Sequence, residues 1–448
     1  MYKKKRLNIA IFHLAFLYSG GGERLVLEES IRLQNLGHKV TCFIPVASDM
    51  NCFPELLKKV KIKRLLPKIL PNWYPDSALL SILGACVFTP LLFFKYREFD
   101  LYLGANQPGP WLAFVLSKLN NKPYIIYLAQ PTRLIHPRLI DQQVGLRINF
   151  GFSMLNIITK VFKPLISLLD VISIKNANTV LANGSYAKGL LEEVYKIKAV
   201  NCPAGSVVQK KVNKSIINER FSGKHKIGEE FIQKPYVLLT NRHFPHKKFE
   251  YAMEAFLKMK RKRIELVITG QETEYTSLLK KKYKKFKRIH FVGLLSEIDL
   301  KKLYGNAALY VYPAPEEDFG MGIVEAMAHG LPVVAWGNAG PTGIIKHEYD
   351  GFLARPFDTA NFAYYMDKVL KNKIIYEKIS LAAQEKVQKH FTYTAHVRLI
   401  DRKVKELYIK WKKNYVKHTS YKGEKKSILK VTDVRQVSRG LLSSHNRE

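Results

Sequence analysis

Cysteine is scarce in this sequence, and its few copies lie far apart. The 448 residues include four, Cys42, Cys52, Cys86 and Cys202. None forms a CxxC pair or stands in a Cys/His cluster, so the spacing predicts neither a disulfide framework nor a zinc site. This usage fits a reducing compartment, and we expect a cytoplasmic protein.

Acidic residues are also under-represented. The chain has 37 Asp and Glu against 73 Lys and Arg, a formal net charge of +36. Such an excess attracts nucleic acid, anionic lipid or phosphorylated substrates, although a compositional bias explains it equally well. In KKKYKKFKR (280–288), aromatic residues separate the basic ones. Nucleic-acid binding is therefore an alternative, but a solvated helix face near anionic lipid is the favoured interpretation.

Long hydrophobic runs are absent, with one exception. ALLSILGACVFTPLLFF (78–94) has no charge over 17 residues, but Gly84 and Pro90 interrupt it. That length is at the lower limit for spanning a bilayer. A buried helix is favoured, and the alternative is a segment that dips into a lipid surface, flanked by Lys95 and Arg97.

The N-terminal half alternates short apolar runs with amphipathic stretches. The start of the chain mimics a signal peptide, but His13 interrupts its apolar part and no small-residue cleavage site follows. We therefore predict a buried strand over 8–14, a glycine-rich loop, a helix and a second strand over 38–46. This is a βαβ unit, which builds parallel sheets. Further predicted strands cover 100–105, 123–129 and 179–185.

A second alternation follows a polar stretch, 206–234, which we interpret as a link between domains. Its predicted elements are a helix over 249–259 and strands over 235–243, 264–270, 288–293, 307–313 and 331–337. The pattern predicts an α/β fold of two doubly wound, Rossmann-like domains that face each other across a cleft, with basic C-terminal helices. Ligands in such sheets bind at the carboxyl ends of the strands.

The domain boundaries follow from the same alternation. We expect an N-terminal domain over 1–212 and a C-terminal domain over 213–395. A C-terminal helix over 396–416 is expected to pack back on the N-terminal domain. The remaining residues, 417–448, are polar and basic, and we expect a mobile tail.

The stretch EDFGMGIVE (317–325) carries the strongest chemical signal. It places Glu317 in a loop after a strand and Glu325 in the helix that follows. Gly320 and Gly322 let backbone N–H groups approach a ligand at the N-terminus of that helix, which favours phosphate. The letters DFG also occur in protein kinases, but the chain has no HRD, VAIK or GxGxxGxV motif, so a kinase is excluded. No Asp/His cluster accompanies the glutamates, so no metal site is predicted.

A second candidate site lies in TNRHFPHKK (240–248). There Arg242 and Lys247 follow a strand and precede a helix. A guanidinium fork and an ammonium at a strand end suit a diphosphate, although a solvated basic turn is the alternative. Gly20, Gly21 and Gly22 form a loop between a strand and a helix. They complete neither GxGxxG nor a P-loop, so they predict only close backbone approach to a ligand.

Together these motifs resemble glycosyltransferase family 4, whose members are retaining, use nucleotide sugars and adopt the GT-B fold. The segments that carry the resemblance are SGGGERLVLE, TNRHFPHKK, HFVGLLSEIDLKKLYGNAALYVYP, EEDFGMGIVEAMAHGLPVVA and GPTGIIKHEYDGFL. They follow the family order from about residue 8 to 415. Within the family, GGGERLVLEESIRLQNLGHKVT and DMNCFPE are most similar to mannosyltransferases that extend lipid-linked oligosaccharides.

The resemblance implies a role for each matching residue. Glu317 would hold the donor hexose near its 3-hydroxyl, and Glu325 would bind the ribose hydroxyls. Arg242 and Lys247 would neutralise the departing diphosphate. The remaining donor contacts would come from the backbone at Phe319, Gly320 and Met321, from Gly293 near the nucleobase, and from Gly21 and Gly22 facing the diphosphate.

Two positions depart from the family pattern. Many relatives carry a histidine in a YCHTP-like turn, whereas Ala129 occupies that place in the turn 127–131. Gln130 or Arg133 would then act on the acceptor side, unless the matching turn is displaced by a residue. Many relatives also have GPxE, whereas residues 340–343 read GPTG, without the acid.

The function that the resemblance implies is transfer of a hexose, mannose in the most similar subgroup, to a glycan or lipid-linked acceptor. The donor would be GDP-mannose or a UDP-hexose, no metal cofactor would be needed, and the enzyme would be peripheral on the cytoplasmic face of an anionic membrane. Two alternatives remain: a non-catalytic protein of the same fold that binds sugar nucleotides, and a basic nucleic-acid-binding protein.

Overall fold

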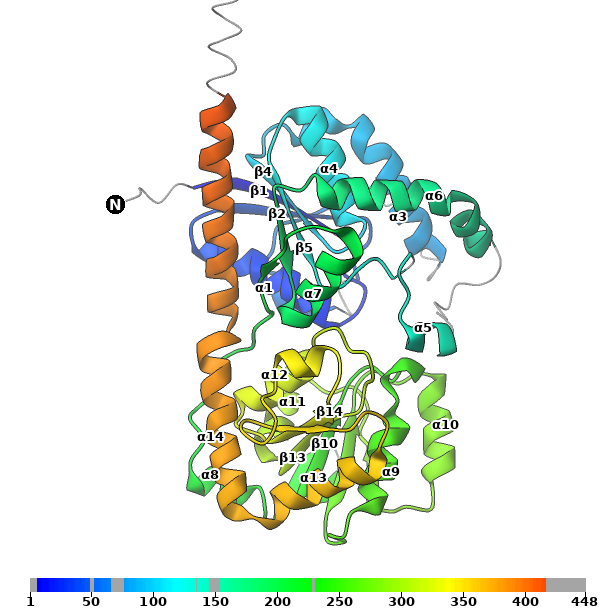
Figure 1. Cartoon of the computed structure of the whole chain (residues 1–448), viewed down its shortest axis with the longest axis vertical. Coiled ribbons are helices and arrows are strands. Elements are labelled where there is room, and N and C mark those ends of the chain that lie inside the picture. The colour runs from blue at the N-terminus through cyan, green and yellow to red at the C-terminus, as the bar shows by residue number, and fades with distance from the viewer. Residues whose placement is uncertain are drawn as a thin grey trace, which may run out of the picture.

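The computed structural model describes residues 6–48, 52–65, 76–133, 135–144, 154–227 and 230–415. They form two parallel sheets, each covered by helices, stacked along the long axis of the molecule (Figure 1). The tail predicted over 417–448 lies outside the described residues. The α/β architecture with two doubly wound sheets is the one that the sequence predicted.

The first sheet has seven parallel strands in the order β3-β2-β1-β4-β5-β6-β7. Its central strands, such as β1 and β5, are buried on both faces, which explains why they read as continuous apolar runs, NIAIFH and YIIYL. The strands are β1 (Asn8–His13), β2 (Lys39–Ile44), β3 (Ile62–Arg64), β4 (Leu101–Ala105), β5 (Tyr124–Leu128), β6 (Thr179–Ala182) and β7 (Val200–Asn201). The helices are α1 (Gly21–Asn35), α2 (Pro54–Leu57), α3 (Asp76–Leu91), η1 (Phe93–Tyr96), α4 (Gly109–Asn120), α5 (Leu139–Val144), α6 (Met154–Lys175) and α7 (Gly184–Tyr195).

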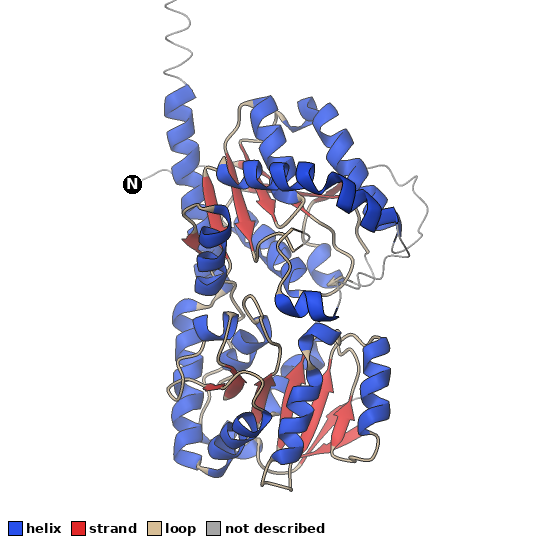
Figure 2. Cartoon of the chain, turned by 45° about the vertical axis from the view of Figure 1, so that its right-hand side comes forward, coloured by secondary structure: helices blue, strands red, loops and turns tan. Residues whose placement is uncertain are grey.

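The second sheet has six strands in the order β12-β11-β10-β13-β14-β15, again all parallel. Its strands are β10 (Tyr236–Thr240), β11 (Glu265–Thr269), β12 (Ile289–Phe291), β13 (Leu309–Tyr312), β14 (Val333–Trp336) and β15 (Phe352–Ala354). Its helices are η2 (Pro245–Lys247), α9 (Phe249–Lys258), α10 (Glu274–Tyr283), α11 (Glu297–Asn306), α12 (Met321–Ala328), η3 (Gly340–Gly343), α13 (Thr359–Lys371) and α14 (Lys373–His390). Figure 2 shows the two sheets with their helices on either side.

The polar stretch 206–234 is more than a link, which corrects the sequence-based interpretation. It contains the helix α8 (Lys214–Glu219) and an antiparallel hairpin of β8 (Lys224–Ile227) and β9 (Glu230–Gln233). The hairpin carries lysines and a glutamate among its few apolar residues, so its sequence lacks the signal of a buried strand.

The chain crosses between the two sheets twice, and the two crossings touch. Ser206 on the first crossing pairs with Thr392 on the second, and Ser206 N donates to Phe391 O at 2.8 Å. Gly205 is required there, because a Cβ would lie 2.2 Å from the carbonyl carbon of Thr392. A helix over 393–415 then runs back along the first domain (Figure 1).

Buried polar contacts fix this returning helix on the first domain. His396 Nε2 lies 2.8 Å from Glu29 Oε1 in α1, and His38 Nε2 lies 2.7 Å from Asp401 Oδ1. His396 Nδ1 also faces the carbonyl oxygen of Pro203 at 2.9 Å. The C-terminal helix is therefore part of the first domain in space, although it follows the second in sequence.

The long apolar run at 78–94 forms most of α3 and η1. Ala85 and Thr89 are buried, as expected for a buried helix, whereas Phe88, Leu91 and Phe94 are exposed by more than half of their surface. The helix is thus buried on one side only. Within the described residues, no helix combines the length and the apolar character needed to cross a membrane.

Candidate active site

A cavity of about 1750 Å³ lies between the two domains, where the strands of both sheets end. The first domain contributes the ends of β1, β4, β5 and β6 through His13, Asn106, Ala129 and Asn183. The second contributes the ends of β10, β11 and β13. A typical small-molecule site occupies about 300–1,000 Å³, so this cavity has room for two substrates.

Glu317 and Lys247 meet inside this cavity. Lys247 Nζ donates to Glu317 Oε2 at 2.6 Å, although 70 residues separate them. Lys247 is placed by η2 after β10, and Glu317 by the loop after the neighbouring strand β13. Burial would raise the pKa of Glu317, but Lys247 and then Arg138 lower it to about 2. Glu317 is therefore ionised at neutral pH.

Glu325 lies one helical turn into α12 and faces a different partner. Its Oε2 accepts a hydrogen bond from the Tyr304 hydroxyl at 3.0 Å, and Arg24 Nη1 approaches its Oε1 to 3.8 Å. Burial raises the pKa of Glu325, and Arg24 opposes that change. Arg24 comes from α1 of the first domain and also forms a two-pronged ion pair with Glu297, at 3.1 and 2.7 Å.

Arg242 lies at the end of β10, with its guanidinium 4.3 Å from the centre of the Tyr18 ring. Tyr18 belongs to the loop before α1, so this stacking joins the two domains across the cavity. The ring contact fixes the plane of the guanidinium while its polar edge stays available for hydrogen bonds. Arg242 and Lys247 both line the cavity.

The glycine positions lie where backbones approach closely. Gly20 precedes α1, and a Cβ on Gly21 would lie 3.1 Å from Met321 Cγ of the opposite domain. Gly22 faces open space beside Asn106. Gly320 caps α12 with a φ of 104°, which a residue with a side chain rarely adopts. The N-terminus of α12, with Gly320 and Met321, therefore opens into the cavity.

Phe319 and Gly293, which were predicted to contact the donor, do not present a side chain to the cavity. The Phe319 side chain is buried and packs on Gly184 and Phe391, so its backbone is the part left for a ligand. Gly293 is not among the residues that line the cavity, and its carbonyl oxygen accepts a hydrogen bond from Gly270 N at 3.0 Å. The next residues, Leu294 and Leu295, line the cavity in its place.

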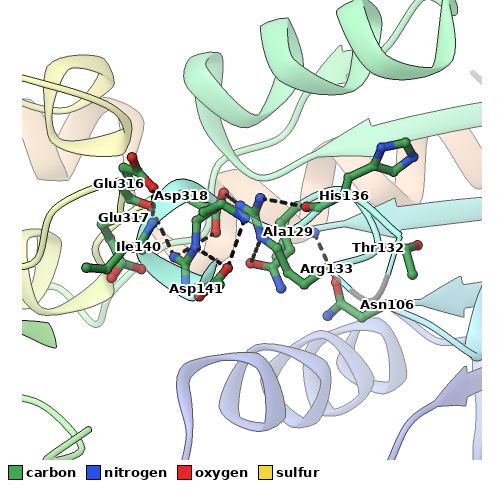
Figure 3. A network of polar contacts seen from close by, with 12 residues as sticks. Asn106, Ala129, Thr132, Arg133, His136, Ile140, Asp141, Glu316, Glu317 and Asp318 are labelled. Atoms are coloured by element: carbon green, nitrogen blue, oxygen red, sulfur yellow. Dashed lines mark hydrogen bonds and ion pairs between the residues drawn. The ribbon is translucent and has the colours of Figure 1, made fainter. Parts of the chain in front are cut away.

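Gln130 and Arg133, the two acceptor-side candidates, contact each other. Arg133 Nε donates to Gln130 Oε1 at 3.2 Å, and Arg133 Nη2 forms an ion pair with Asp318. The loop after β5 thus reaches across the cavity to the loop that carries Glu317 (Figure 3). Arg138, just before α5, joins this contact by binding Asp141 of α5 and the carbonyl oxygen of Glu316 in the other loop.

Both departures from the family pattern have a structural setting. The backbone N–H of Ala129 donates to Asn106 Oδ1 at 3.0 Å, which fixes the turn without a side chain at 129. Gly343 in η3 packs against α7 of the first domain, where a Cβ would lie 2.5 Å from Ser185 Oγ. Any side chain at position 343 would therefore require the Ser185 hydroxyl to move.

Some cavity residues were not among those that the sequence predicted. Arg138 lines the cavity but belongs to no motif, and its partner Glu316 lies 178 residues away along the chain. Arg24 could have been found, because it closely follows the glycine motif, in the first turn of α1. Among the described residues, no group of three or more His, Cys, Asp or Glu side chains is placed to hold a metal ion.

Comparison with known proteins shows which proteins this chain is similar to. Residues 222–386, most of the second domain, match the family model described as glycosyl transferases group 1. Over nearly the whole chain, the protein is similar to alpha-1,3/1,6-mannosyltransferases. That of Dictyostelium discoideum is 22% identical, covering 90% of this chain and 99% of the relative, and that of Homo sapiens is 23% identical, covering 87% and 94%.

Solved structures share the fold. A sucrose-phosphate synthase from Thermosynechococcus elongatus matches with a TM-score of 0.70 and 18% identity, covering 90% of this chain and all of that one. The Anabaena protein HepE, solved in complex with UDP-glucose, matches with a TM-score of 0.66 and 17% identity, over the same shares. The matched domain, the similar mannosyltransferases and the two facing sheets together identify this chain as a glycosyltransferase of the GT-B fold that resembles the lipid-linked oligosaccharide mannosyltransferases.

Proposed function

We propose that the enzyme transfers mannose, with retention, from GDP-mannose to a lipid-linked glycan. The observation that carries the proposal is the ion pair between Glu317 and Lys247, which lines the same cavity as Arg242 and the N-terminus of α12. The similarity to alpha-1,3/1,6-mannosyltransferases over nine tenths of the chain supports the choice of mannose over a UDP-hexose.

The cavity supplies charge where the reaction needs it. When a sugar leaves a nucleoside diphosphate, negative charge grows on the bridging phosphate oxygen. Lys247, Arg242 and the N-terminus of α12 converge on this part of the cavity and would stabilise that charge. Because these groups are already cationic or dipolar, we propose that transfer needs no metal ion, and that chelation by EDTA leaves the rate unchanged.

Glu317 would hold the sugar and not attack it. With a pKa of about 2 it is an anion that accepts hydrogen bonds, which suits the 3-hydroxyl of the donor hexose. Glu325, held by Tyr304, would bind the ribose hydroxyls. In this scheme the acceptor hydroxyl attacks from the side of the leaving diphosphate, whose oxygen takes the proton. No second carboxylate is then needed as an acid or base.

The test is transfer by the purified full chain. A polyprenyl diphosphate oligosaccharide is incubated with GDP-mannose, UDP-glucose or UDP-N-acetylglucosamine, and the product's mass and anomeric configuration are measured. We expect an α-mannosyl product from GDP-mannose and at least a 100-fold lower rate for Glu317→Gln. Glu272→Gln, which changes a surface glutamate paired with Lys280, is the matched control. Transfer of another sugar, or inversion at the anomeric carbon, would overturn the proposal.

We also propose that the enzyme works on the cytoplasmic face of an anionic membrane. The described part of α6 exposes Val161, Phe162, Leu165 and Leu168 beside the exposed Lys163. Its one described carboxylate, Asp170, is buried and bound by Thr132 and Tyr195. α3 exposes its own apolar side chains ahead of Lys95, and both helices pack on α4 (Figure 1).

Apolar side chains bordered by lysines suit the interface of an anionic bilayer. We expect sedimentation with vesicles that contain phosphatidylserine, weaker sedimentation with neutral vesicles, and a marked loss for Phe88→Ser/Leu165→Ser. The control is Leu278→Ser/Ile298→Ser, which removes two exposed apolar side chains of the second domain. Equal sedimentation of both double variants would contradict the proposal, and tight, salt-sensitive binding to RNA instead of vesicles would favour a nucleic-acid partner.

A further inference from the structure

The loop that carries Glu317 is held from the opposite domain. Arg138 Nη1, in the first domain, donates to the carbonyl oxygen of Glu316 at 3.0 Å, and the backbone N–H of Ile140 donates to Glu316 Oε2 at 3.0 Å. On the other side of Glu317, Asp318 forms an ion pair with Arg133 and lies 3.5 Å from Arg138. Both neighbours of Glu317 are thus bound by Arg133, Arg138 and Ile140 of the first domain (Figure 3).

We propose that Arg138 and Arg133 are positioning residues, which hold Glu317 in the orientation that grips the donor sugar. The proposal rests on the function proposed above, and adds to it that the donor site is completed by the acceptor-side domain. Neither arginine needs to touch the donor for this role.

The backbone of Glu316 shows why such a hold is needed. Its φ is 51°, in the left-handed region. A residue with a side chain persists in this sparsely populated region only when its surroundings fix it there. The carbonyl oxygen and the carboxylate of Glu316 are both bound by the other domain. Because Glu317 is the next residue, this conformation sets the direction of its side chain.

The arginines are oriented within their own domain. Arg138 binds Asp141 through Nε at 2.9 Å and Nη2 at 2.7 Å, a two-pronged contact that leaves Nη1 directed at Glu316. Arg133 is held by Gln130 and by the carbonyl oxygen of His136, at 3.4 Å. Neither guanidinium therefore has to give up much side-chain freedom when the two domains meet.

Burial makes these contacts stronger than surface ion pairs. The side chains of Arg133, Arg138 and Asp318 are exposed by 13%, 14% and 9%. Removing one partner of a shielded pair leaves the other charge buried and uncompensated. In a surface pair, water solvates the charge that remains. A neutral substitution on one side of the cleft should therefore disturb the Glu317 loop on the other.

The experiment compares kinetic constants of Arg138→Gln, Arg138→Lys and Asp318→Asn with those of Arg355→Gln. The control removes an arginine from a surface pair with Asp358, away from the cavity. We expect kcat to fall about 10- to 100-fold, the range for a small misplacement of a catalytic group, with KM for the donor within about twofold. Arg138→Lys, which keeps the charge, should recover part of the loss.

A mutant cycle tests whether the ion pair acts as a unit. Arg133→Gln combined with Asp318→Asn should be no slower than Asp318→Asn alone, since both remove one interaction. Independent, multiplying losses would overturn the proposal. So would kcat within twofold of the unaltered enzyme for Arg138→Gln.

A second readout separates this inference from the proposed function. Hydrogen exchange at the amides of residues 316–320 should accelerate in Arg138→Gln and stay unchanged in Arg355→Gln, whatever sugar the enzyme uses. Unchanged exchange in both would overturn the positioning role even if mannose transfer is confirmed. Faster exchange in an enzyme that transfers no mannose would sustain the positioning role and reject the proposed substrate.

Discussion

Glu317 is charged in surroundings that would ordinarily keep a carboxyl group neutral. It is enclosed by protein, and its low pKa depends on the ammonium of Lys247 at 2.6 Å and on Arg138 beyond it. Such a group stays an anion over the whole range in which enzymes are assayed. The carboxylate that would grip the sugar is therefore insensitive to pH as long as Lys247 is present.

Replacing Lys247 should make the enzyme pH-sensitive. In Lys247→Gln the largest influence that lowers the pKa of Glu317 is removed while burial remains, so that pKa rises. We expect an acid limb in kcat between about pH 5 and 7 that the unaltered enzyme lacks. Lys280→Gln, on the surface, is the control. A profile of unchanged shape would show that Lys247 does not set the charge of Glu317.

Gly343 marks a second residue-scale feature, a close contact between domains in which an added Cβ would meet the Ser185 hydroxyl. Gly343→Glu, which would restore the acid of the family pattern, places a Cβ 2.5 Å from Ser185 Oγ. We expect it to destabilise the protein by about 1–3 kcal/mol, the usual cost of overpacking. Gly189→Glu should be nearly neutral, because Gly189 lies on α7, the helix of Ser185, but has no atom within 4 Å of an added Cβ. Thermal unfolding of the two variants measures the difference.

At the scale of elements, apolar runs were the most reliable guide. Strands such as β1, β5 and β10 lie within two or three residues of their predicted bounds, because a strand buried on both faces must be apolar throughout. β3 and β7 were not predicted, since IKR and VN are too short and too polar to differ from loop sequence. β15 was not predicted because its three residues, FLA, form too short a run, and the hairpin of β8 and β9 was not predicted because its sequence is mostly polar.

The helix over 393–415 depends on a buried histidine. Burial would lower the pKa of His396, but Cys202 and Glu29 raise it to about 10. A folded-state pKa above the unfolded value near 6.5 contributes stability that is complete below pH 6.5 and is lost as pH rises towards 10.

His396→Ala should therefore cost stability in a pH-dependent way. Near pH 6 we expect a loss of about 3–5 kcal/mol, the cost of leaving Glu29 buried without its partner. The difference from the unaltered protein should shrink between pH 6.5 and 10 in urea unfolding curves. His347→Ala, at a partly exposed site, should show a small and nearly constant difference. A constant large difference would mean that the pair is not ionic.

At the scale of the whole molecule, the sequence predicted one half of the site better than the other. The second-domain residues Glu317, Glu325 and Lys247 lie in continuous motifs, and the structure places them around one cavity. Their roles towards a donor stay predictions. The contacts across the cleft depend on how two separately folded sheets face each other, and no local pattern encodes that. The ion pair between Arg138 and Asp318 is an example of such a contact.

Arg24 offers a test of how firmly the domains are held together. It binds Glu297 of the other domain with two hydrogen bonds and lies near Glu325. We expect Arg24→Gln to open the cleft and increase the radius of gyration measured by small-angle X-ray scattering without ligand. Arg32→Gln, which breaks a pair within α1, is the control. Equal radii for the two variants would show that the Arg24 pair does not hold the cleft closed.

The two adjoining crossings at Ser206 and Thr392 have a mechanical consequence. Two domains joined by one chain segment can rotate about several axes, whereas two segments bonded side by side restrict the rotation to one hinge axis. Opening is then guided along one arc, and twisting of one domain against the other is resisted. A protease that cuts one connection leaves the halves attached by the other. Exchanging the second domain for that of a relative requires two junctions in the sequence, one near Ser206 and one near Thr392.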